Sequence, residues 1–468
     1  MVFSSLEFMF LYFPVVLLLY FITPLKWRNA TLFLTSLIFY GWGEPLYVFL
    51  MLFTITVDYF FGFMVGKYRE TNRRRAKGYM IAAIVINLAI LGFFKYANLA
   101  LDTVAALTGA KVAHLNVALP VGISFYTFQA LSYVIDVYRM DANAQRNYTA
   151  FGTYVTLFPQ LIAGPIVRYQ DVDDQLRSRT HSAELFASGV RTLAAGMGKK
   201  VLLANAAGEI WSRISEAPET TVAAAWLGII MYTFQIYFDF SGYSDMAIGL
   251  GKMMGFSFRE NFYYPYMAAS VTDFWRRWHI SLSTWFREYV YIPLGGNRRG
   301  RGRQIFNLLA VWFLTGLWHG ASWNFVLWGL YYFVLLMLEK TFLLKLLDKL
   351  PRFVGHVYTL ITVVFGWLLF VSTDFAAGMN YLATMFGGGR ATAFIDAGGA
   401  FDWISSLILL AILIIASTPY PKKWLYKLWE KYDAPVRVVT AILCLAVFFI
   451  AVAYLVNSSY NPFLYYRF

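Results

Sequence analysis

The chain has 468 residues, of which 59% are hydrophobic, 19% aromatic and only 14% charged, against about 25% charged in ordinary globular domains. Its 39 basic and 26 acidic residues leave a net charge of +13, and a single cysteine, Cys444, excludes a disulfide within the chain. The basic residues gather in short loops between apolar runs, which indicates membrane orientation rather than nucleic-acid binding. Soluble enzymes, disordered scaffolds and disulfide-rich secreted domains are excluded, and an all-α polytopic membrane protein is predicted.

Apolar runs near the length of a membrane helix follow one another along the chain. A helix needs roughly 20 apolar residues to cross about 30 Å of hydrocarbon. Several runs are short or carry Gly, Pro or charges, so we expect about 11 transmembrane helices plus re-entrant or interfacial helices. The N-terminal run lacks a basic region and a cleavage site, which predicts an uncleaved first helix. The runs are 6–23, 30–43, 45–66, 79–98, 119–137, 148–165, 185–205, 222–251, 305–338, 356–373, 401–417 and 436–455.

The loops between the first runs alternate in charge. The loops 26–28, 67–77 and 139–146 are basic, whereas the loops 41–45 and 100–118 carry few basic residues. Under the positive-inside rule this alternation predicts an extracytoplasmic N-terminus. Because no internal repeat, Pro-rich linker or low-complexity tract stands out, we expect one integral-membrane domain over the whole chain, residues 1–468.

Two segments depart from the apolar pattern. The most polar stretch, 168–192, predicts a cytoplasmic loop that leads into an amphipathic helix, and the Gly/Ala-rich segment after residue 375 predicts a surface excursion.

Asp239 and Asp245 lie in the apolar segment 235–256, where Ser241, Gly242 and Ser244 suggest a broken helix. Two roles stay open for these carboxylates. Capping of the broken helix ends is favoured, and a proton relay is the alternative.

The segment 271–289 is predicted to form one amphipathic helix. At about 100° per residue, its aromatic face carries Trp275, Trp278, His279, Leu282, Trp285 and Phe286. The opposite face carries Asp273, Arg276, Arg277, Ser281, Thr284 and Arg287. His279 is thus a titratable group on an aromatic face, and a buried imidazole needs hydrogen-bond partners. A structural histidine bonded to a nearby carbonyl and a functional histidine are both open.

His319 lies near the middle of residues 304–338, which contain no Asp, Glu, Lys or Arg. One helix over this stretch would be about 50 Å long, longer than the hydrocarbon is thick. Gly316 and Gly320 permit a break beside the histidine, so two segments are expected. Ionisable groups inside membranes usually line polar pathways. A turn at the lipid–water boundary is the alternative.

These two histidines favour acid–base chemistry. A metal site is not expected, because His279 and His319 are 40 residues apart and no HExxH motif or nearby carboxylate cluster occurs. No GxSxG elbow or P-loop occurs either. A single histidine acting as general base is the economical alternative. His114, His181 and His356 are expected to be solvated surface residues.

A basic run without acids precedes the segment that contains His319. It could bind the phosphates of a cofactor by charge-assisted hydrogen bonds, or it could be a topology anchor, which is slightly favoured. Its arginines are Arg298, Arg299, Arg301 and Arg303.

Three long segments together resemble the membrane-bound O-acyltransferase family, in particular its bacterial branch of the alginate O-acetyltransferase type. They are FDFSGYSDMAIGLGKMMGF, NFYYPYMAASVTDFWRRWHISLSTWFREYVYIPLGGNRRG and NLLAVWFLTGLWHGASWNFVLWG. Shorter pieces of the same pattern are PVGISFYTFQALSYVIDVYR, FPQLIAGPIVRY and the terminal NPFLYYRF. The likeness runs along the whole chain, and the pair WRRWHISLS and GLWHG is its most specific part.

The resemblance implies an all-α membrane enzyme around a central funnel, with a catalytic core at about 120–340, that moves an acyl group from a cytoplasmic donor to an extracytoplasmic acceptor. The histidine of the family's GLWHG-type motif is catalytic and matches His319. The second motif position matches His279; many lipid-acylating relatives carry Asn there, and His fits the polysaccharide-acylating branch. We expect His319 to act as general base and His279 to orient or stabilise the thioester carbonyl, with Ser281 or Tyr243.

The same resemblance implies the substrates and partners. Acetyl-CoA is expected as a donor substrate rather than a bound cofactor, with its phosphates near the four arginines. Expected partners are membrane lipids, an extracytoplasmic SGNH-type acetyltransferase and a polysaccharide-synthesis complex, in the bacterial cytoplasmic (inner) membrane. The residues expected to support the tunnel are Trp275, Trp278, Ser281, Tyr243, Asp239, Asp245, Trp318 and Asn324.

Alternatives for the function stay open. The favoured hypothesis is O-acetylation of an alginate-type exopolysaccharide. Acetylation of peptidoglycan and D-alanylation of teichoic acid are alternatives within the same family. A transporter or flippase for a lipid-linked sugar is the alternative from another class, and inverted repeats, which are not evident, would favour it.

Overall fold

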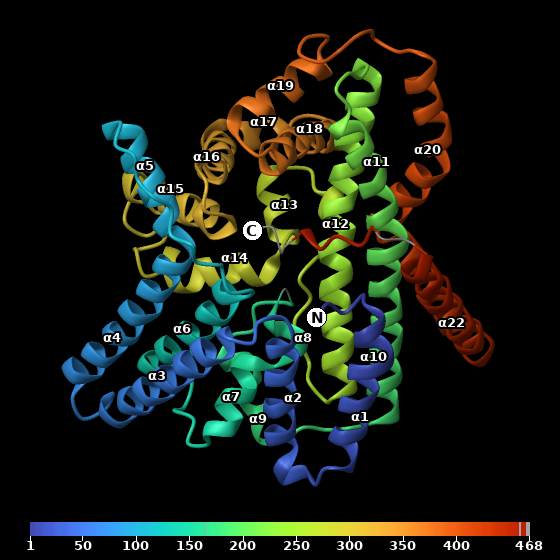
Figure 1. Cartoon of the computed structure of the whole chain (residues 1–468). Coiled ribbons are helices and arrows are strands. Elements are labelled where there is room, and N and C mark those ends of the chain that lie inside the picture. Colours follow the sequence, from blue (N-terminus) through green and yellow to red (C-terminus); the bar gives the residue numbers. More distant parts are fainter. Residues whose placement is uncertain (163, 458–459, 465–468) are drawn as a thin grey trace. The chain divides into compact units, whose positions relative to one another are not determined.

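A computed structural model of the chain describes residues 1–162, 164–457 and 460–464, which are mostly helical (Figure 1). Within these ranges there is no β-strand, only one bridge between Thr220 and Ala391. A helix satisfies its own backbone hydrogen bonds, which is what lipid demands of a spanning segment. The predicted all-α class is confirmed.

The chain divides into two compact units. Unit 1 comprises Met1–Leu193 and Tyr243–Arg259, and unit 2 comprises Ala194–Gly242 and Glu260–Phe468. The helices α10 (Ala183–Met197) and α12 (Val222–Met253) contribute residues to both units. Whether residues 1–468 act as a single acyltransferase domain stays a prediction.

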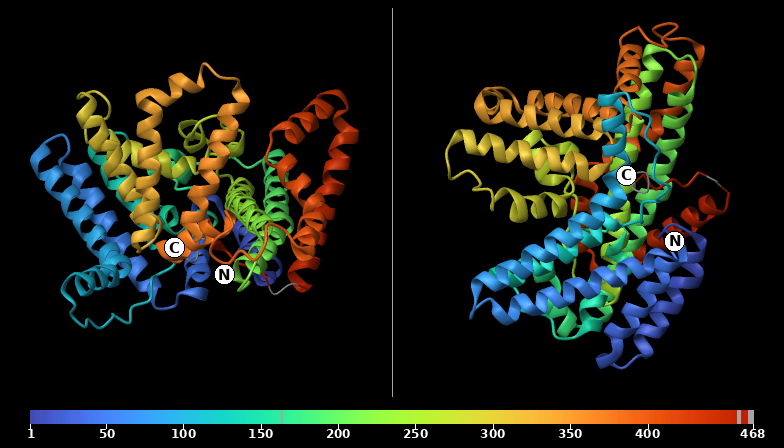
Figure 2. Two further views of the ribbon diagram at one scale, coloured as in Figure 1. Left: turned by 90° about the horizontal axis from the view of Figure 1, so that it is seen from above. Right: turned by 60° about the vertical axis from the view of Figure 1, so that its left-hand side comes forward.

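The helices of unit 1 begin at polar caps and pack through apolar faces. Asn72, for example, accepts a hydrogen bond from the Arg75 N–H and so caps α4. The neighbouring helices α3 and α4 lie side by side (Figure 2). Besides parts of α10 and α12, the unit contains α1 (Phe13–Ile22), α2 (Arg28–Gly43), α3 (Tyr47–Tyr68), α4 (Arg73–Leu91), α5 (Ala97–Thr108), α6 (Ile123–Arg139), α7 (Tyr148–Thr156), α8 (Phe158–Leu161) and α9 (Tyr169–Arg177).

Unit 2 contains His279, His319 and most of the C-terminal helices. Besides parts of α10 and α12, it contains α11 (Asn205–Glu216), α13 (Val271–Arg277), α14 (Ile280–Phe286), α15 (Arg301–His319), α16 (Trp323–Leu338), α17 (Leu344–Leu347), α18 (Arg352–Val371), α19 (Phe375–Met385), α20 (Ala397–Ala416), α21 (Tyr420–Lys431) and α22 (Asp433–Asn457).

The predicted break in residues 304–338 is confirmed. Helix α15 ends at His319, the backbone is extended at Gly320, and α16 begins at Trp323. The two helices then pack along one another (Figure 2). A Cβ at Gly316 would collide with the Phe325 carbonyl of the facing helix, so glycine is what permits this close approach.

Six helical runs in the described part of the chain are long and apolar enough to cross a membrane, and Phe8–Ile22 is a shorter apolar helix. In α12, 78% of the most apolar stretch is buried within the protein, against 11% in α22. Helix α12 is therefore a core helix, whereas α22 presents apolar side chains outward, as contact with lipid requires. The protein is a multi-pass membrane protein, and the total of about 11 crossings stays a prediction. The six runs are Tyr47–Tyr68, Arg73–Thr108, Val222–Met253, Arg352–Val371, Ala397–Ala416 and Asp433–Asn457.

The expected break in the segment 235–256 is wrong, because α12 runs through it as a continuous helix. Gly242 serves a different purpose. A Cβ at this position would lie 2.7 Å from the Gly196 carbonyl oxygen and 2.9 Å from the Lys200 nitrogen. The glycine therefore lets another backbone approach the helix, and capping of broken ends is not a role that Asp239 can have here.

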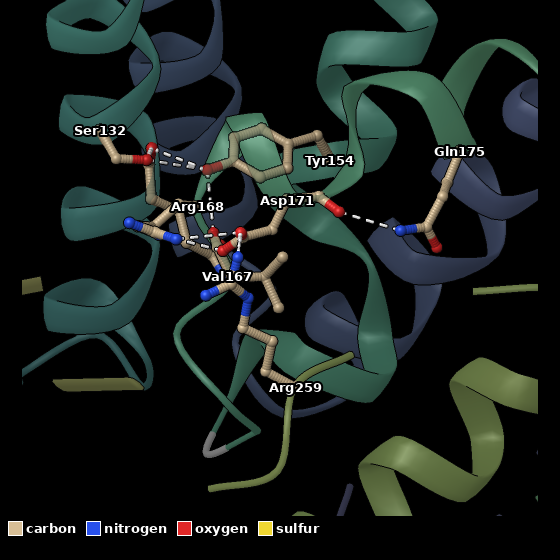
Figure 3. A network of polar contacts seen from close by, with 8 residues as sticks. Ser132, Tyr154, Val167, Arg168, Asp171, Gln175 and Arg259 are labelled. Carbon is tan, nitrogen blue, oxygen red and sulfur yellow. Dashed lines mark hydrogen bonds and ion pairs between the residues drawn. The ribbon is translucent and has the colours of Figure 1, made fainter. Parts of the chain in front are cut away.

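A polar network, largely buried except for the exposed Arg259, holds the segment after α8 to its neighbours in unit 1 (Figure 3). Arg168 donates from Nε and Nη2 to the two carboxylate oxygens of Asp171, both at 3.0 Å. The same carboxylate lies 2.7 Å from Arg259 Nη2. The Tyr154 hydroxyl donates to the Val167 carbonyl at 3.0 Å and lies 3.1 Å from Ser132 Oγ. These bonds fix the end of the FPQLIAGPIVRY segment.

Candidate active site

The segment 271–289 does not form the single helix that was expected. Helix α13 ends at Arg277, Trp278 is extended, and α14 begins only at Ile280. The Ile280 N–H donates instead to the Asn261 carbonyl at 2.9 Å. Tertiary hydrogen bonds to a preceding loop have thus replaced the helical ones, which periodicity alone could not predict.

His279 lies at this break in a left-handed backbone conformation, with φ of +44°. Among the described residues, only Met140 and Tyr264 share a positive φ without being glycine. Such a conformation is strained for a residue with a Cβ, and it persists only where the surroundings determine it. Strain of this kind often accompanies functional sites.

Asn261 fixes the imidazole of His279, which is 1% exposed. The Asn261 Oδ1 accepts from the Ser281 backbone N–H at 3.1 Å and from Ser281 Oγ at 2.9 Å. A backbone N–H can only donate, so this atom of Asn261 is the oxygen. His279 Nδ1 lies 3.2 Å from the same oxygen and is therefore the protonated nitrogen in the neutral ring.

His319 ends α15 and is 4% exposed. Its ring is surrounded by aromatic rings, with centroid distances of 5.0 Å to Trp318, 4.9 Å to Trp328 and 5.3 Å to Phe370. The carbonyl groups at a helix C-terminus carry partial negative charge, which stabilises positive charge on a nearby imidazole. An imidazole that accepts a proton is well placed at this position.

The structure brings the two predicted histidines to one centre in unit 2. The Trp318 ring lies 5.9 Å from that of His279 and 5.0 Å from that of His319. The two imidazoles are also close enough to interact electrostatically. Residues 40 positions apart in the sequence thus meet in one buried, aromatic environment.

Other expected support residues surround this centre. Trp275 contacts Trp328 at 5.6 Å, and Trp278 contacts Trp367 at 4.7 Å. Asn324 donates from Nδ2 to the Ser372 carbonyl at 2.9 Å and to the Leu369 carbonyl at 2.5 Å. These two bonds hold the end of α18, which carries Phe370 against His319.

Two positioning residues escaped the sequence analysis. Asn261 lies in an irregular loop where nothing in the pattern marks it. Glu339 is 1% exposed and accepts hydrogen bonds from the Val271 and Thr272 N–H groups, at 2.6 and 2.8 Å. It therefore caps α13 from the end of another helix. Its place directly after an apolar run of more than 30 residues is the signal that could have identified it.

Asp239 forms a buried ion pair with Lys200, at 2.6 Å. Its other carboxylate oxygen accepts from the Leu464 N–H at 3.0 Å, and Lys200 Nζ donates to the Pro462 carbonyl. The pair therefore anchors the segment 460–464. Tyr243 and Asp245 are in unit 1, where Tyr243 stacks on Phe3 at 4.4 Å.

The four arginines of the basic run are exposed, in the loop before α15 and in its first turn. None forms an ion pair with a carboxylate among the described residues. Arg303 donates to the Leu294 carbonyl at 2.8 Å. Their binding of a phosphorylated donor therefore stays a prediction, as does the alternative of a topology anchor.

The remaining histidines differ from one another. His114 is exposed, as expected, and lies 2.5 Å from Asp102. The expectation of a solvated side chain is wrong for the other two, which are half-buried. His181 is bonded to the Tyr20 hydroxyl at 2.8 Å, and His356 to the Ala268 carbonyl at 2.9 Å. In the described part of the chain, no three His, Cys, Asp or Glu side chains gather as around a metal ion.

Comparison with known proteins places the chain among relatives of known family. The sequence model of MBOAT, the membrane-bound O-acyltransferase family, matches residues 142–381. The chain is 37% identical to a probable alginate O-acetylase, AlgI, of Azotobacter vinelandii, over 100% of both chains. It is 40% identical to the corresponding protein of Pseudomonas aeruginosa, over 82% of this chain and 75% of the relative. It is 31% identical to a peptidoglycan O-acetyltransferase of Helicobacter pylori, over 83% and 80%.

The matched region includes both histidines, the loop that contains Asn261 and the helix break at Gly320. Its length exceeds half of the chain, and the three relatives cover between 82% and 100% of the chain. This protein belongs to the membrane-bound O-acyltransferase family.

Proposed function

We propose that the protein takes an acetyl group from cytoplasmic acetyl-CoA and passes it across the membrane for O-acetylation of an extracytoplasmic, alginate-type polysaccharide. The observation that carries this proposal is the meeting of His279 and His319 in one buried centre of unit 2. The likeness to alginate O-acetylases supports the choice of acyl group and polymer.

In the proposed reaction, His319 acts as general base. It takes the proton of the acceptor hydroxyl while the hydroxyl oxygen attacks the thioester carbonyl. The C–S bond then breaks, and the departing thiolate of CoA takes up a proton from the imidazolium. The C-terminal end of α15 stabilises the charged imidazolium between these two steps.

The hydrogen bonds of His279 sharpen its proposed role. Because Nδ1 donates to Asn261, the neutral ring offers Nε2 as an acceptor, which can orient the acceptor hydroxyl. Stabilisation of the thioester oxyanion would require the protonated ring, which donates from both nitrogens. Ser281 already donates its hydroxyl to Asn261, so it supports His279 rather than the thioester.

The remaining parts of the proposal concern location and partners. The basic loops favour an extracytoplasmic N-terminus in the bacterial inner membrane. The exposed arginines before α15 would then meet acetyl-CoA in the cytoplasm. An extracytoplasmic SGNH-type acetyltransferase would receive the acetyl group and work with the polysaccharide-synthesis complex.

One relative favours a second candidate polymer. The identity of 31% to a peptidoglycan O-acetyltransferase extends over 83% of the chain, so acetylation of peptidoglycan is the alternative within the same chemistry. Family membership favours both over a sugar transporter. Acetylation of oligosaccharides from either polymer by membranes that contain the protein would distinguish the two.

The experiment that tests the proposal uses purified protein in detergent and acetyl-CoA labelled on the acetyl group. With water as the acceptor of the acetyl group, release of CoA is measured for the wild type, for His319→Ala and for the control His114→Ala, which replaces an exposed histidine. Loss of a general base predicts a fall of about 10²- to 10⁴-fold in His319→Ala, with the control unchanged. Equal turnover in both variants would overturn the assignment.

A further inference from the structure

A cavity of about 380 Å³ lies in unit 2, outside the histidine centre. Its walls come from α11, α12, α19, the end of α18 and the segment 460–464. No histidine lines it. The volume is within the range of sites for small ligands.

One wall of this cavity is shared with the histidine centre. Leu368 and Val371 line the cavity, and Phe370 between them contacts the His319 ring at 5.3 Å. Ser372 also lines it, and its carbonyl accepts the hydrogen bond from Asn324. A molecule in the cavity would therefore lie beside the residues that hold His319.

Aromatic rings and neutral polar groups form the lining. Trp211 contacts the rings of Tyr232 and Tyr381, at 5.2 and 5.3 Å, and all three line the cavity. Hydroxyl and amide side chains such as Ser212 and Asn380 lie among them. Aromatic faces pack against the C–H face of a sugar ring, while amides and hydroxyls bond its hydroxyl groups. The lining thus has the chemistry of a saccharide site.

Gln235 supplies a buried acceptor in this lining. The side chain is 2% exposed, and its Nε2 donates to the Tyr460 hydroxyl at 3.3 Å. Its Oε1 has no hydrogen-bond partner among the described residues. This oxygen is therefore an acceptor that a donating group of a ligand, such as a sugar hydroxyl, can use.

Arg390 supplies the cationic group of the cavity. Its Nη1 donates to the Ser215 and Ala217 carbonyls, at 3.0 and 2.6 Å, which fixes the guanidinium 5.8 Å from the Tyr381 ring. It forms no ion pair with a carboxylate in the described ranges. The bonds through Nη1 leave Nε and Nη2, which can pair with both oxygens of a carboxylate.

The other charged group of the lining is the exposed Glu216. Because Glu216 is exposed, water and salt screen its repulsion of a ligand carboxylate. A uronic acid combines one carboxylate, which Arg390 can bind, with several hydroxyl groups and an apolar ring face, which suit the rest of the lining.

We infer that this cavity binds a saccharide of the acceptor polymer, and that Arg390 pairs with the carboxylate of a uronic acid and so determines specificity. The inference rests on the proposed function, because it assigns to this chain a binding site for the polymer that the acetyl group finally modifies. It places recognition of the sugar in unit 2, next to the wall that carries Phe370.

The test measures binding of an oligomannuronate and of a neutral oligosaccharide of equal length, by calorimetry on the full chain in detergent. The wild type should bind the uronate with at least tenfold higher affinity than the neutral oligosaccharide, which is about the contribution expected of one bidentate charge pair. Arg390→Gln should bind both oligosaccharides equally, and Arg390→Lys should retain part of the preference. The control Arg213→Gln replaces an exposed arginine on α11, paired with Asp402, and should leave it unchanged.

A second variant covers failure of Arg390→Gln to fold, which its thermal unfolding midpoint would reveal. Asn380→Ala, at an exposed position of the lining, should weaken the binding of both oligosaccharides to the same extent. Equal binding of the two sugars by the wild type overturns the role of Arg390, and absence of saccharide binding overturns the whole inference. Because release of CoA is measured without any sugar, His319-dependent cleavage with no saccharide binding would leave the proposed function standing.

Discussion

The polar network of unit 1 and the histidine centre of unit 2 are both built from polar side chains enclosed by apolar ones, yet they differ in how those side chains are satisfied. In the network, Asp171 faces two arginines and its two oxygens are bonded (Figure 3). In the centre, the His319 ring is surrounded by three aromatic rings, and one amide oxygen orients His279.

This difference separates structural polar groups from chemical ones. A carboxylate whose two oxygens are both bonded has little capacity left for a substrate, and its partners keep it in one geometry. An imidazole can change its protonation state near neutral pH, which is what acid–base chemistry requires. Replacement of a residue in the network should therefore change stability, and replacement in the centre should change rate.

The largest effect is expected for His319→Gln, which keeps the volume of the side chain but removes the base. Acetyl-CoA cleavage should fall about 10²- to 10⁴-fold. The thermal unfolding midpoint in detergent should stay close to that of the wild type, because the side-chain volume among the aromatic rings is kept. A large fall of the midpoint would mean that the centre is structural, and the comparison would fail.

The next effect is expected for Asp171→Asn, which leaves Arg168 without its buried carboxylate. Breaking such a pair should lower the free energy of unfolding by about 3–5 kcal/mol, while acetyl-CoA cleavage per folded molecule stays unchanged. The control is Asp433→Asn, because Asp433 forms an exposed ion pair with Arg437 at 2.6 Å. Loss of this pair should lower the free energy of unfolding by at most about 1 kcal/mol. Equal losses of stability in the two variants would show that the network stabilises the fold no more than an exposed ion pair does.

A smaller effect on rate is expected for Asn261→Ala, which removes the oxygen that orients His279. The rate constant kcat should fall about 10- to 100-fold, because a misplaced group loses its alignment, and KM for acetyl-CoA should change little. Asn261→Asp keeps an acceptor oxygen and should retain more activity than the alanine variant. A fall in stability without this split between kcat and KM would make Asn261 a purely structural residue.

The smallest effect concerns pH and a histidine outside the centre. Burial, together with Arg28 and Arg179, lowers the pKa of His181 below its ordinary value of 6.5. As the pH falls, this histidine therefore binds its proton at a higher pH in the unfolded chain than in the folded chain. The stability that is present above pH 6.5 is lost as the pH falls towards the lower pKa of the folded state. Between pH 7.5 and 5.5, the unfolding midpoint of the wild type should fall slightly more than that of His181→Gln, and equal falls would contradict the assignment.

How far the site could be predicted depends on the type of signal that each residue left. His319 was identifiable because no charged residue lies near it in the sequence and glycines flank it, and the helix break beside it was predicted for the same reason. His279 was identifiable as a residue, but the helix assigned to it was wrong. Asn261 lies 18 residues before His279, in an irregular loop, and a hydrogen bond between distant residues leaves no trace in local periodicity.

The segment around Asp239 shows the opposite failure, in which a local pattern predicted a structure that does not occur. The serines and glycine around it suggested a broken helix, whereas the structure has a continuous α12 and a buried pair with Lys200. Glycine serves equally for a break and for a close approach of another backbone, and only the neighbour decides which one occurs. In this protein the neighbour of Gly242 is the backbone at Gly196, so the glycine permits a close approach and not a break.

The all-α class, the membrane location and the choice of the two histidines could be read from the amino-acid sequence, because the length of an apolar run and the presence of an isolated ionisable group are local properties of a segment. The pairing of groups depends instead on the folded chain, as the left-handed turn at His279, the oxygen of Asn261, the cap of Glu339 and the cavity beside Arg390 show. Each of these depends on contacts between segments far apart in the chain, whose hydrogen bonds and charges outweigh local helical preference once the helices have packed.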